Sequence, residues 1–478
     1  MKRLDYILLS LILMIALGLR LYNINTPLAD LHSWRQADTA AVARNFSRDG
    51  INLLRPTYDD LSSIQTGIEN PEGLRMVEFP LYNAIVSVFV RYLPITSVTV
   101  YGRLVSSVFS LVTIAILYYF GLKEKNRLAA IAAAGIFAIY PFFVFFSRTV
   151  LPETTAVSFM MIALFLLHIG LSKDKKLSAL LFIGSVVFFA MSILIKPTTI
   201  FYALAAGYLF IDSYRFEVFK NWRPYVYFIL ALVPFALWRS YILAFPEGIP
   251  ASAWLITHVN TFEGPKNIFF KPAFFRWIFM ERIGIAMFGI FGTFFLLFGT
   301  ISKYKRFFFH SMLFSALVYL FTFQGGNVQH EYYQTILLPA MALMSGAGLA
   351  QLAELPKKMV HGFILYPMIL VVFCIGFLFS YYKVKDYYYY PKDLPQIAQL
   401  IQAFTKPDDK IVTDRTGDTT LLYLADRKGA PAVYKEVSEL KKLGYSFLVT
   451  SNDEMTQKLK GQGFIVLVEN EFYSLIQL

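Results

Sequence analysis

The stretch LADLHSWRQADTAAVARNFSRDG, residues 28–50, contains the residue types that acid–base chemistry on an anionic substrate requires. If it folds as a helix, Arg35 and Asp38 share one face, because residues three positions apart are neighbours on a helix surface. A carboxylate can take a proton from an attacking hydroxyl, and a guanidinium can hold a phosphate. The alternative is an amphipathic surface helix in which the same pair contributes only about 0.2–0.5 kcal/mol.

Local signals predict where this helix begins and ends. Ser33 and Gln36 have the spacing of a capping box, and Gly50 is a typical C-terminal stop, so we expect a helix over 34–49. His32 precedes the helix, at an end where backbone N–H groups gather and favour phosphate.

Other ionisable or aromatic side chains occur at the ends of apolar runs. Ionisable residues at membrane depth are functional candidates by default, although charges at span ends can also stay hydrated. Glu78, taken alone, has the properties of a solvated loop acid, and Lys196 could either extend to the interface or meet a phosphate. The remaining candidates are Arg148 and Glu153 in SRTVLPE and His330, Glu331, Tyr332 and Tyr333 in HEYYQTILLPAMALMSGAG.

Several familiar chemical motifs are missing from the sequence. It has no H-E-x-x-H, no Cys/His cluster, no G-x-S-x-G elbow and no phosphate-binding loop. The single cysteine, Cys374, lies inside an apolar run and excludes an intramolecular disulfide. No cofactor is therefore indicated by a motif.

The composition is that of a polytopic membrane protein. Of 478 residues, 56% are hydrophobic and 17% aromatic, and the apolar residues fall in runs of about 18–22, the length that crosses a bilayer. The formal net charge of +12 comes largely from short basic clusters between these runs, which is typical of cytoplasmic loops. We therefore expect an all-α membrane domain and no nucleic-acid partner.

Charge alternation predicts about eleven transmembrane helices with the N-terminus in the cytoplasm. The first apolar run is too long for a signal-peptide core and has no cleavage site behind it, so it reads as an anchor. The expected spans are 4–22, 99–121, 128–146, 154–171, 177–195, 198–213, 225–244, 284–301, 307–323, 334–353 and 360–381. The clusters Lys123/Lys125/Arg127, Lys173/Lys175/Lys176, Arg215/Lys220/Arg223, Lys303/Lys305/Arg306 and Lys357/Lys358 then all lie inside, provided that 80–93 lies along the outer interface.

This topology predicts two domains with their polar chemistry on the outer side. The transmembrane domain covers 1–381 and includes a long first outer loop, 23–98; a second outer loop covers 245–283. Residues 382–478 are expected to form an extracytoplasmic α/β domain. There the β-type runs KIVT, SFLVTS, FIVLVE and YSLIQL alternate with helix-like DLPQIAQLIQAF and NDEMTQKLKG.

The order of motifs along residues 1–350 resembles that of C-type (GT-C) glycosyltransferases, within the protein O-mannosyltransferase and aminoarabinose transferase branch. The matching motifs are ARNFSRDG, EFPLY, GRLVSS, FFSRTVLPE, ILIKP and HEYYQTILLPAMAL. The resemblance implies transfer of a sugar from a dolichyl- or polyprenyl-phosphate donor to a lipid, glycan or protein acceptor. The reaction would take place on the outer face of the plasma (inner) membrane, in glycan biosynthesis for the cell envelope.

Carried over residue by residue, the resemblance shows two departures in the first loop. The family's acidic residue, about 15 positions before the glycine matched by Gly50, is Arg35 in this chain. We therefore expect Asp38, one helical turn on, to be the catalytic carboxylate, with Asp30 as the next candidate. Where aminoarabinose transferases have a lysine before Pro-Pro-Leu, this chain has Glu78.

The remaining roles implied by the resemblance fall into two groups. The residues expected to bind the donor phosphate are Arg35, Arg148, Lys196 and His330. Those expected to contact the sugar or a divalent cation, Mg²⁺ or Mn²⁺, are Glu78, Glu153, Tyr332 and Tyr333. A metal requirement is left open by the resemblance, since the branch includes members without one.

A single displacement by the acceptor hydroxyl would invert the anomeric centre. The alternative from another class is a transporter or flippase of lipid-linked sugars, but such proteins place their site near the bilayer midplane, usually on broken helices within repeats. A surface-polysaccharide polymerase or ligase would use the same donor and the same compartment, and spacing alone does not separate it from a glycosyltransferase of the predicted kind.

Overall fold

The computed structural model describes residues 1–171, 175–250, 268, 271–355 and 361–478. Contacts divide the chain into two compact units. Unit 1 comprises Met1–Ile24, Arg103–Arg239 and Ala253–Tyr387, and unit 2 comprises Asn25–Gly102, Ser240–Ser252 and Tyr388–Leu478. The first outer loop thus groups with the tail, whereas the predicted boundary at 381/382 leaves it with the spans; whether these parts act as two domains stays a prediction.

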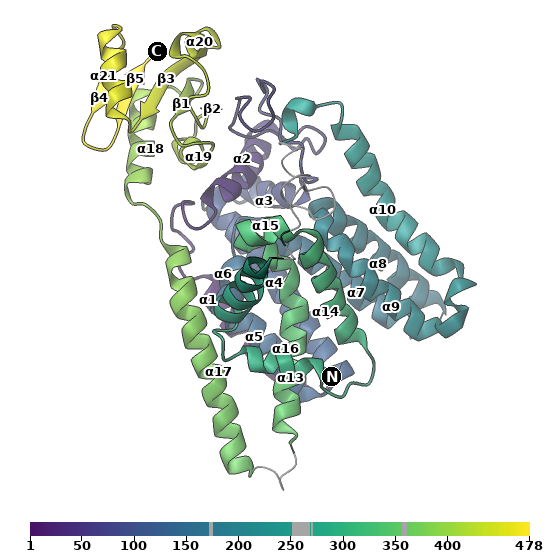
Figure 1. Cartoon of the computed structure of the whole chain (residues 1–478). Helices are drawn as coiled ribbons and strands as arrows, with labels where there is room; N and C mark the ends of the chain where they lie inside the picture. The colour runs from purple at the N-terminus through teal and green to yellow at the C-terminus, as the bar shows by residue number, and fades with distance from the viewer. Residues whose placement is uncertain (172–174, 251–267, 269–270, 356–360) are drawn as a thin grey trace. The chain divides into compact units, whose positions relative to one another are not determined.

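Unit 1 is built from long apolar helices (Figure 1). An apolar helix suits a bilayer because it satisfies its backbone hydrogen bonds internally. Helices α4 and α10 each run a few residues into unit 2. The elements of unit 1 are α1 (Arg3–Arg20), α4 (Val98–Glu124), α5 (Arg127–Ile139), α6 (Pro141–Phe146), α7 (Glu153–Gly170), α8 (Lys175–Ile195), η1 (Pro197–Tyr202), α9 (Ala203–Tyr214), η2 (Arg215–Phe219), α10 (Trp222–Ile242), α12 (Pro272–Phe275), η6 (Arg276–Met287), α13 (Thr293–Thr300), α14 (Phe308–Thr322), α15 (Gln324–Gln329), η7 (Glu331–Leu337), α16 (Leu338–Ala353), α17 (Gly362–Val384) and η8 (Lys385–Tyr388).

Six helical segments among the described residues are long and apolar enough to cross a membrane. They are Val98–Glu124, Glu153–Gly170, Leu177–Ile195, Trp222–Ile242, Glu331–Ala353 and Gly362–Phe404. Each predicted span coincides with at least one helix, but several are shorter than a bilayer crossing, as at 128–146, where Pro141 separates α5 from α6. The count of about eleven spans therefore stays a prediction.

Two of the predicted features lie partly outside the described residues. The second outer loop, 245–283, includes 251–267 and 269–270, and the basic clusters include Lys173, Lys357 and Lys358.

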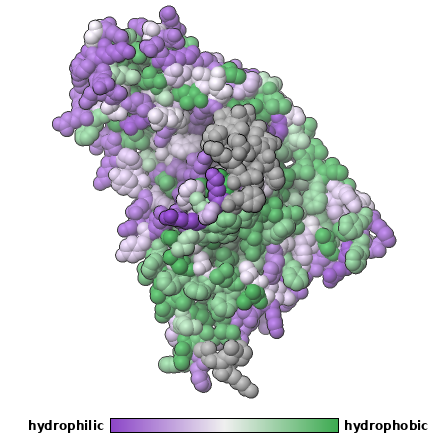
Figure 2. All heavy atoms as spheres, in the orientation of Figure 1, coloured by the Kyte–Doolittle hydropathy of each residue, from purple (hydrophilic) through white to green (hydrophobic). Residues whose placement is uncertain are grey.

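Much of the surface of the helical region is apolar, as Figure 2 shows in green. Helix α17 is the clearest case: Phe363 is 91% exposed, and Leu370 and Val371 are also exposed. In water such an apolar face would promote aggregation, whereas lipid tails solvate it. The multi-pass membrane character predicted from composition is therefore supported by the folded chain.

Unit 2 combines the first outer loop with a small α/β fold (Figure 1). The first loop supplies α2 (Ser33–Asp49) and α3 (Leu81–Tyr92), and η3 (Pro246–Gly248) comes from the second. The tail supplies α18 (Asp393–Phe404), β1 (Lys410–Thr413), α19 (Thr420–Ala425), β2 (Gly429–Ala430), α20 (Val437–Lys442), β3 (Tyr445–Thr450), α21 (Asp453–Gly461), β4 (Ile465–Glu469) and β5 (Ser474–Gln477).

The tail forms one mixed sheet with strand order β2-β1-β3-β5-β4. Strand β1 is parallel to β2 and β3, and β5 is antiparallel to β3 and β4. Alternate residues of β1 and β3 join two separate apolar cores: Ile411 and Phe447 belong to one, and Val412 and Leu448 to the other. All four predicted strands and both predicted helices are present, while the short elements β2, α19 and α20 were not predicted.

The first loop pairs with the β2 edge of this sheet. Asp60 bridges Gly429 of β2 in parallel fashion. The backbone N–H of Leu61 donates to the Gly429 carbonyl at 2.7 Å, and the Gly429 N–H donates to the Asp59 carbonyl at 2.8 Å. An unpaired sheet edge invites pairing with other chains, so this contact both covers the edge and ties the first loop to the tail.

Candidate functional site

Helix α2 forms where the sequence predicts it, but it begins differently. Its N-cap is His32, in the left-handed region with φ +57°, and no side chain caps the helix. The predicted capping box is therefore wrong: the Gln36 side chain instead donates to Asp30 Oδ1 at 2.7 Å, because the carboxylate lies within reach of its amide. The helix ends at Gly50, whose φ of +98° favours glycine, as predicted.

Asp38 lies on the buried face of α2, and its side chain is 0% exposed. Its Oδ2 is 3.0 Å from Arg75 Nη2, and its Oδ1 accepts a hydrogen bond from Thr419 Oγ1 at 2.6 Å. Burial raises the pKa of this carboxyl above its usual value, while Arg75, Thr419 and Arg35 oppose that shift. In this geometry Asp38 anchors α2 to the loop and to the tail.

Arg35 and Glu78 form an ion pair at the beginning of α2. Arg35 Nη2 lies 2.5 Å from Glu78 Oε1, and the side chains are 8% and 13% exposed. Glu78 stands two residues before Pro80, the N-cap of α3. The pair is thus held between the starts of two helices and is more open than the Asp38 carboxylate.

The far end of α2 is held by charges that the sequence did not reveal. Arg44 forms ion pairs with Asp59 and with Asp426, and its guanidinium lies over the Tyr423 ring. Arg48 pairs with the same Asp426 at 2.7 Å. Asp426 and Tyr423 lie more than 370 positions from Arg44 and Arg48, so no local pattern could have found these two partners.

Asp60 is a second unpredicted feature of this unit. Its Oδ1 accepts hydrogen bonds from the Ser62 backbone N–H at 2.9 Å and from Ser62 Oγ at 2.6 Å, while its Oδ2 is buried without a hydrogen-bond partner. Burial raises the pKa of Asp60 to about 7, although the Ser62 hydrogen bonds act in the opposite direction. A carboxyl with this pKa titrates in the physiological range.

In unit 1 the structure brings together several of the predicted donor-binding residues. Lys196 Nζ lies 2.6 Å from Glu153 Oε1. The same ammonium is 5.6 Å from the centre of the Tyr333 ring and 6.0 Å from that of Tyr332. His330 stacks on Tyr332 with ring centres 5.4 Å apart. The first residue of α7, the N-cap of η1 and the beginning of η7 thus form one cluster of charged and aromatic groups.

Unit 1 contains two further arginines, Arg148 and Arg282, with polar contacts to distant parts of the chain. Arg148 is buried, and its Nη2 donates to the Asn23 carbonyl at 3.0 Å. Arg282, which the sequence did not single out, forms an ion pair with Glu331 at 2.5 Å. Arg148, a buried cation beside the apolar helices α6 and α7, is a functional candidate for that reason, whereas Arg282 is half-buried within η6.

The predicted site residues therefore fall into one group in each unit. Unit 2 holds Asp30, Arg35, Asp38 and Glu78, and unit 1 holds Arg148, Glu153, Lys196, His330, Tyr332 and Tyr333. Their convergence on one cavity stays a prediction.

The described residues do not assemble a site for a divalent cation. No group of three His, Cys, Asp or Glu side chains with suitable spacing occurs among them. The two carboxylates offered as ligands, Glu78 and Glu153, already have cationic partners in Arg35 and Lys196. This donor set suits ion pairs better than Mg²⁺ or Mn²⁺, which prefer several carboxylate or carbonyl oxygens.

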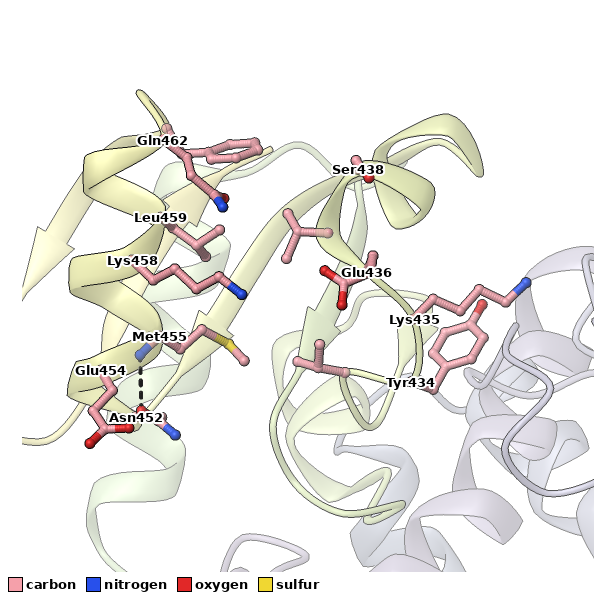
Figure 3. Close-up of a pocket in the computed structure, with 13 residues that line it drawn as sticks. Tyr434, Lys435, Glu436, Ser438, Asn452, Glu454, Met455, Lys458, Leu459 and Gln462 are labelled. Atoms are coloured by element: carbon pink, nitrogen blue, oxygen red, sulfur yellow. Dashed lines mark hydrogen bonds between the residues drawn. The ribbon is translucent and has the colours of Figure 1, made fainter.

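A groove of about 830 Å³ opens in the tail, between α21 and the segment that leads into α20 (Figure 3). Its apolar lining comes from Val433, Val437, Met455, Leu459 and Phe464. Its polar lining comes from Tyr434, Lys435, Glu436, Ser438, Asn452, Glu454, Lys458 and Gln462. Two lysines and two glutamates leave the groove without a net charge that would select a ligand.

Comparison with known proteins gives a match to a family model over part of the chain and a fold shared with solved structures. Residues 80–241 match the family model described as dolichyl-phosphate-mannose-protein mannosyltransferase. This segment includes Arg148, Glu153 and Lys196. No curated protein matches the chain.

Solved structures extend the likeness over the whole chain. ArnT from Cupriavidus metallidurans, bound to undecaprenyl phosphate, is 12% identical with a TM-score of 0.67, covering 100% of this chain and 98% of that one. The oligosaccharyltransferase AglB from Archaeoglobus fulgidus is 11% identical with a TM-score of 0.59, covering 94% and 69%. The arabinofuranosyltransferase AftD from Mycobacteria is 12% identical with a TM-score of 0.54, covering 98% and 41%.

At these identities the solved structures show a shared fold, and the matched family points to the same class of protein. Together they confirm the predicted resemblance to GT-C membrane glycosyltransferases.

Proposed function

Starting from that class, we propose that this membrane glycosyltransferase moves a sugar from a polyprenyl-phosphate carrier to a lipid, glycan or protein acceptor on the outer face of the plasma membrane. The observation that carries the proposal is the fold shared along the whole chain with ArnT, whose structure holds undecaprenyl phosphate. Polyprenyl phosphate is both the donor's anchor and the leaving group of such a transfer. The proposal thus names a lipid-linked donor and leaves the sugar open.

The cluster around Lys196 has the chemistry that a departing phosphate requires. A leaving phosphate gains negative charge in the transition state, and a fixed cation in a water-poor site stabilises that charge far better than bulk water does. Lys196 is buried, and tyrosine rings and Glu153 hold it in place. We assign the donor phosphate to Lys196, with His330 and Arg148 as further contacts.

Reconstitution tests this function directly. The purified chain in proteoliposomes is given radiolabelled undecaprenyl-phosphate sugars and a lipid extract, and transfer to the extract is measured. We expect transfer by the wild type and a loss of about 10²-fold or more in Lys196→Met, the range seen when one stabilising group for transition-state charge is removed. Product with inverted configuration is expected from a single displacement.

Lys435→Met is the matched control for Lys196→Met. Lys435 also pairs with a carboxylate, Glu69, at 2.8 Å and also lies 5.6 Å from a tyrosine ring, but it belongs to the tail. Its variant should retain wild-type transfer. Movement of the labelled lipid across the bilayer without bond cleavage would instead indicate a flippase, and long repeating products would indicate a polysaccharide polymerase.

A further inference from the structure

We propose that the turn between α9 and α10, residues 215–223, is a docking surface for the anionic headgroups of membrane phospholipids. Its occupant is a lipid such as phosphatidylglycerol, which carries a negative phosphate next to its acyl chains. The turn belongs to unit 1. It uses none of the residues assigned to sugar transfer, so the inference goes beyond the proposed function and does not depend on it.

The turn joins two apolar helices (Figure 1). The 3₁₀-helix η2 follows α9 directly, and α10 begins at Trp222. Helix α10 is long and apolar enough to cross a membrane, and α9 is also apolar in sequence. A charged turn between such helices lies at the surface of the bilayer. The predicted topology assigns this turn to the cytoplasmic leaflet, which is the leaflet where anionic lipids gather.

The first argument is a ridge of exposed aromatic side chains. A 3₁₀-helix has roughly three residues per turn, so side chains three positions apart lie on the same side. Phe216 and Phe219 have this spacing in η2 and are 90% and 74% exposed. Trp222, three positions further on, is exposed as well. Aromatic side chains held open beside apolar helices suit the boundary between lipid tails and headgroups, where such residues are enriched.

The second argument is the charge beside this ridge. Residues 215–223 contain three cations, Arg215, Lys220 and Arg223, and one carboxylate, Glu217. The side chains of Arg215 and Lys220 are each 79% exposed, and they lie 3.9 Å from Asp212 and 3.5 Å from Glu217. These distances exceed that of a direct hydrogen bond, so both cations keep N–H donors for a lipid phosphate.

The third argument is that the turn is held in place. Arg215 has φ +52°, a conformation that is costly for a residue with a side chain and persists only where the surrounding structure imposes it. The Tyr225 hydroxyl donates to the Phe219 carbonyl at 3.2 Å, and Arg223 Nη1 donates to the Tyr214 hydroxyl at 3.1 Å. The aromatic ridge is therefore exposed in a turn that is fixed from both of its helices.

Rings and cations together favour a lipid over a soluble partner. Lysine and arginine extend their charged ends toward water while neighbouring apolar side chains enter the lipid, as in helices that lie on a membrane surface. Phosphatidylglycerol offers acyl chains to Phe216 and Phe219 and a phosphate to Arg215 and Lys220. An acidic soluble protein would match only the cations.

A probe at residue 216 tests the proposal locally. Cys374 is the single native cysteine, so the full-length variant Cys374→Ser/Phe216→Cys takes one fluorophore. It is reconstituted in mixtures of phosphatidylcholine and phosphatidylglycerol in which one of the two lipids has brominated acyl chains. Bromine quenches on contact, so the two quenching efficiencies show which lipid lies at the turn. We expect quenching by both lipids and a preference for phosphatidylglycerol of at least about fivefold, the effect of one basic side chain near an anionic surface.

Phe472→Cys in the same background is the matched control. Phe472 is also an exposed phenylalanine, but it belongs to the tail. We expect neither brominated lipid to quench a fluorophore at residue 472.

Charge variants then test the headgroup contact with effects of opposite sign. Arg215→Gln/Lys220→Gln should lower the preference for phosphatidylglycerol to below about twofold. Glu217→Gln removes the carboxylate of the turn and should raise the preference. All three side chains are well exposed, so the variants keep the fold, and a general disturbance of the turn would not produce opposite changes. Added salt should weaken the preference of the unaltered turn, because it screens exposed charges.

Three results would overturn the proposal. They are a probe at residue 216 that neither lipid quenches, equal quenching by the two lipids, and a preference that Arg215→Gln/Lys220→Gln leaves intact. The first result would place the turn in water, as a surface for a soluble acidic protein requires. None of these measurements uses sugar transfer, so a failure of the proposed function would leave them unchanged.

Discussion

Helices α2 and α17 distribute their polar and apolar side chains in opposite ways. Of the 17 residues of α2, 12 are buried, and these include Arg35, Asp38 and Arg44. Of the 23 residues of α17, only Leu365, Gly376, Ser380 and Val384 are buried, while large apolar side chains face outward. The polar helix is enclosed by protein, and the apolar helix is exposed.

The difference shows that which side chains are buried in this chain depends on two solvents, lipid and water. Lipid tails are as apolar as leucine, so α17 needs no protein cover. The charged residues of α2 would be solvated equally well by water, so their enclosure must be offset by specific partners such as Arg75, Asp59 and Asp426. Removing those partners should therefore harm α2 far more than removing apolar contacts would harm α17.

Arg75→Met tests the most enclosed of these pairs. It leaves the Asp38 carboxylate buried without its cation, and we expect a loss of about 3–5 kcal/mol in the free energy of unfolding of unit 2. Limited proteolysis in proteoliposomes under increasing denaturant measures it. The double variant Asp38→Asn/Arg75→Met should lose less than the sum of the single losses, and wild-type protease resistance in Arg75→Met would contradict the comparison.

Val371→Lys tests the opposite side of the comparison, on the exposed apolar surface of α17. A lysine near the centre of a membrane helix costs about 2.5–3.5 kcal/mol in insertion assays. We expect a matching fall in the inserted fraction of α17. Leu443→Lys is the control: Leu443 is an exposed residue of the tail, and its variant should stay within about 0.5 kcal/mol of the wild type.

Asp60→Asn sharpens the comparison, because Asp60 is a buried acid of unit 2 and no cation among the described residues lies as close to it as Arg75 lies to Asp38. Its pKa, about 7 in the folded chain, exceeds the ordinary value of 3.8, so the folded state favours the neutral carboxyl. Its contribution to stability is fully present below about pH 4 and is lost as the pH rises through about 7.

Asparagine is neutral at every pH and retains the oxygen that accepts from Ser62. Asp60→Asn should therefore be more stable than the wild type at pH 8 by on the order of 4 kcal/mol, with no difference near pH 4. Thermal unfolding of the two proteins between pH 4 and 8 gives the measurement. Parallel pH profiles would show that Asp60 does not titrate as described.

Arg48→Ala should have the smallest effect. The Arg48 ion pair with Asp426 lies at 2.7 Å, but the side chains are 55% and 35% exposed. Exposed pairs of this kind contribute about 0.2–1 kcal/mol. The same unfolding assay should show a change below about 1 kcal/mol, and a loss as large as that of Arg75→Met would break the distinction between enclosed and exposed charges.

Local patterns predicted most of the secondary structure because it depends on residues close in sequence. The extent of α2, its end at Gly50 and the strands KIVT and SFLVTS follow from helix-stop signals and from runs of β-branched and aromatic residues. The capping box failed because Gln36 had a better acceptor in Asp30, a competitor that spacing alone does not reveal.

The site was harder to predict because its contacts join distant parts of the chain. Asp38 could be chosen as a candidate base from its helical position, but its enclosure depends on Arg75 and on Thr419, which lies in the tail. The two departures at Arg35 and Glu78 could be noticed separately, and only folding shows that they meet. The ion pair between Lys196 and Glu153 likewise becomes visible only in the folded structure.

The bridge between Asp60 and Gly429 joins the first loop to the tail, so these contacts form only after the tail has been synthesised. Helix α2 emerges early in synthesis, yet two of the residues that contact its polar side chains, Thr419 and Asp426, are translated more than 360 codons later. A chain that ends before the tail therefore lacks these contacts of α2 and retains only those from the first loop, such as Arg75 and Asp59.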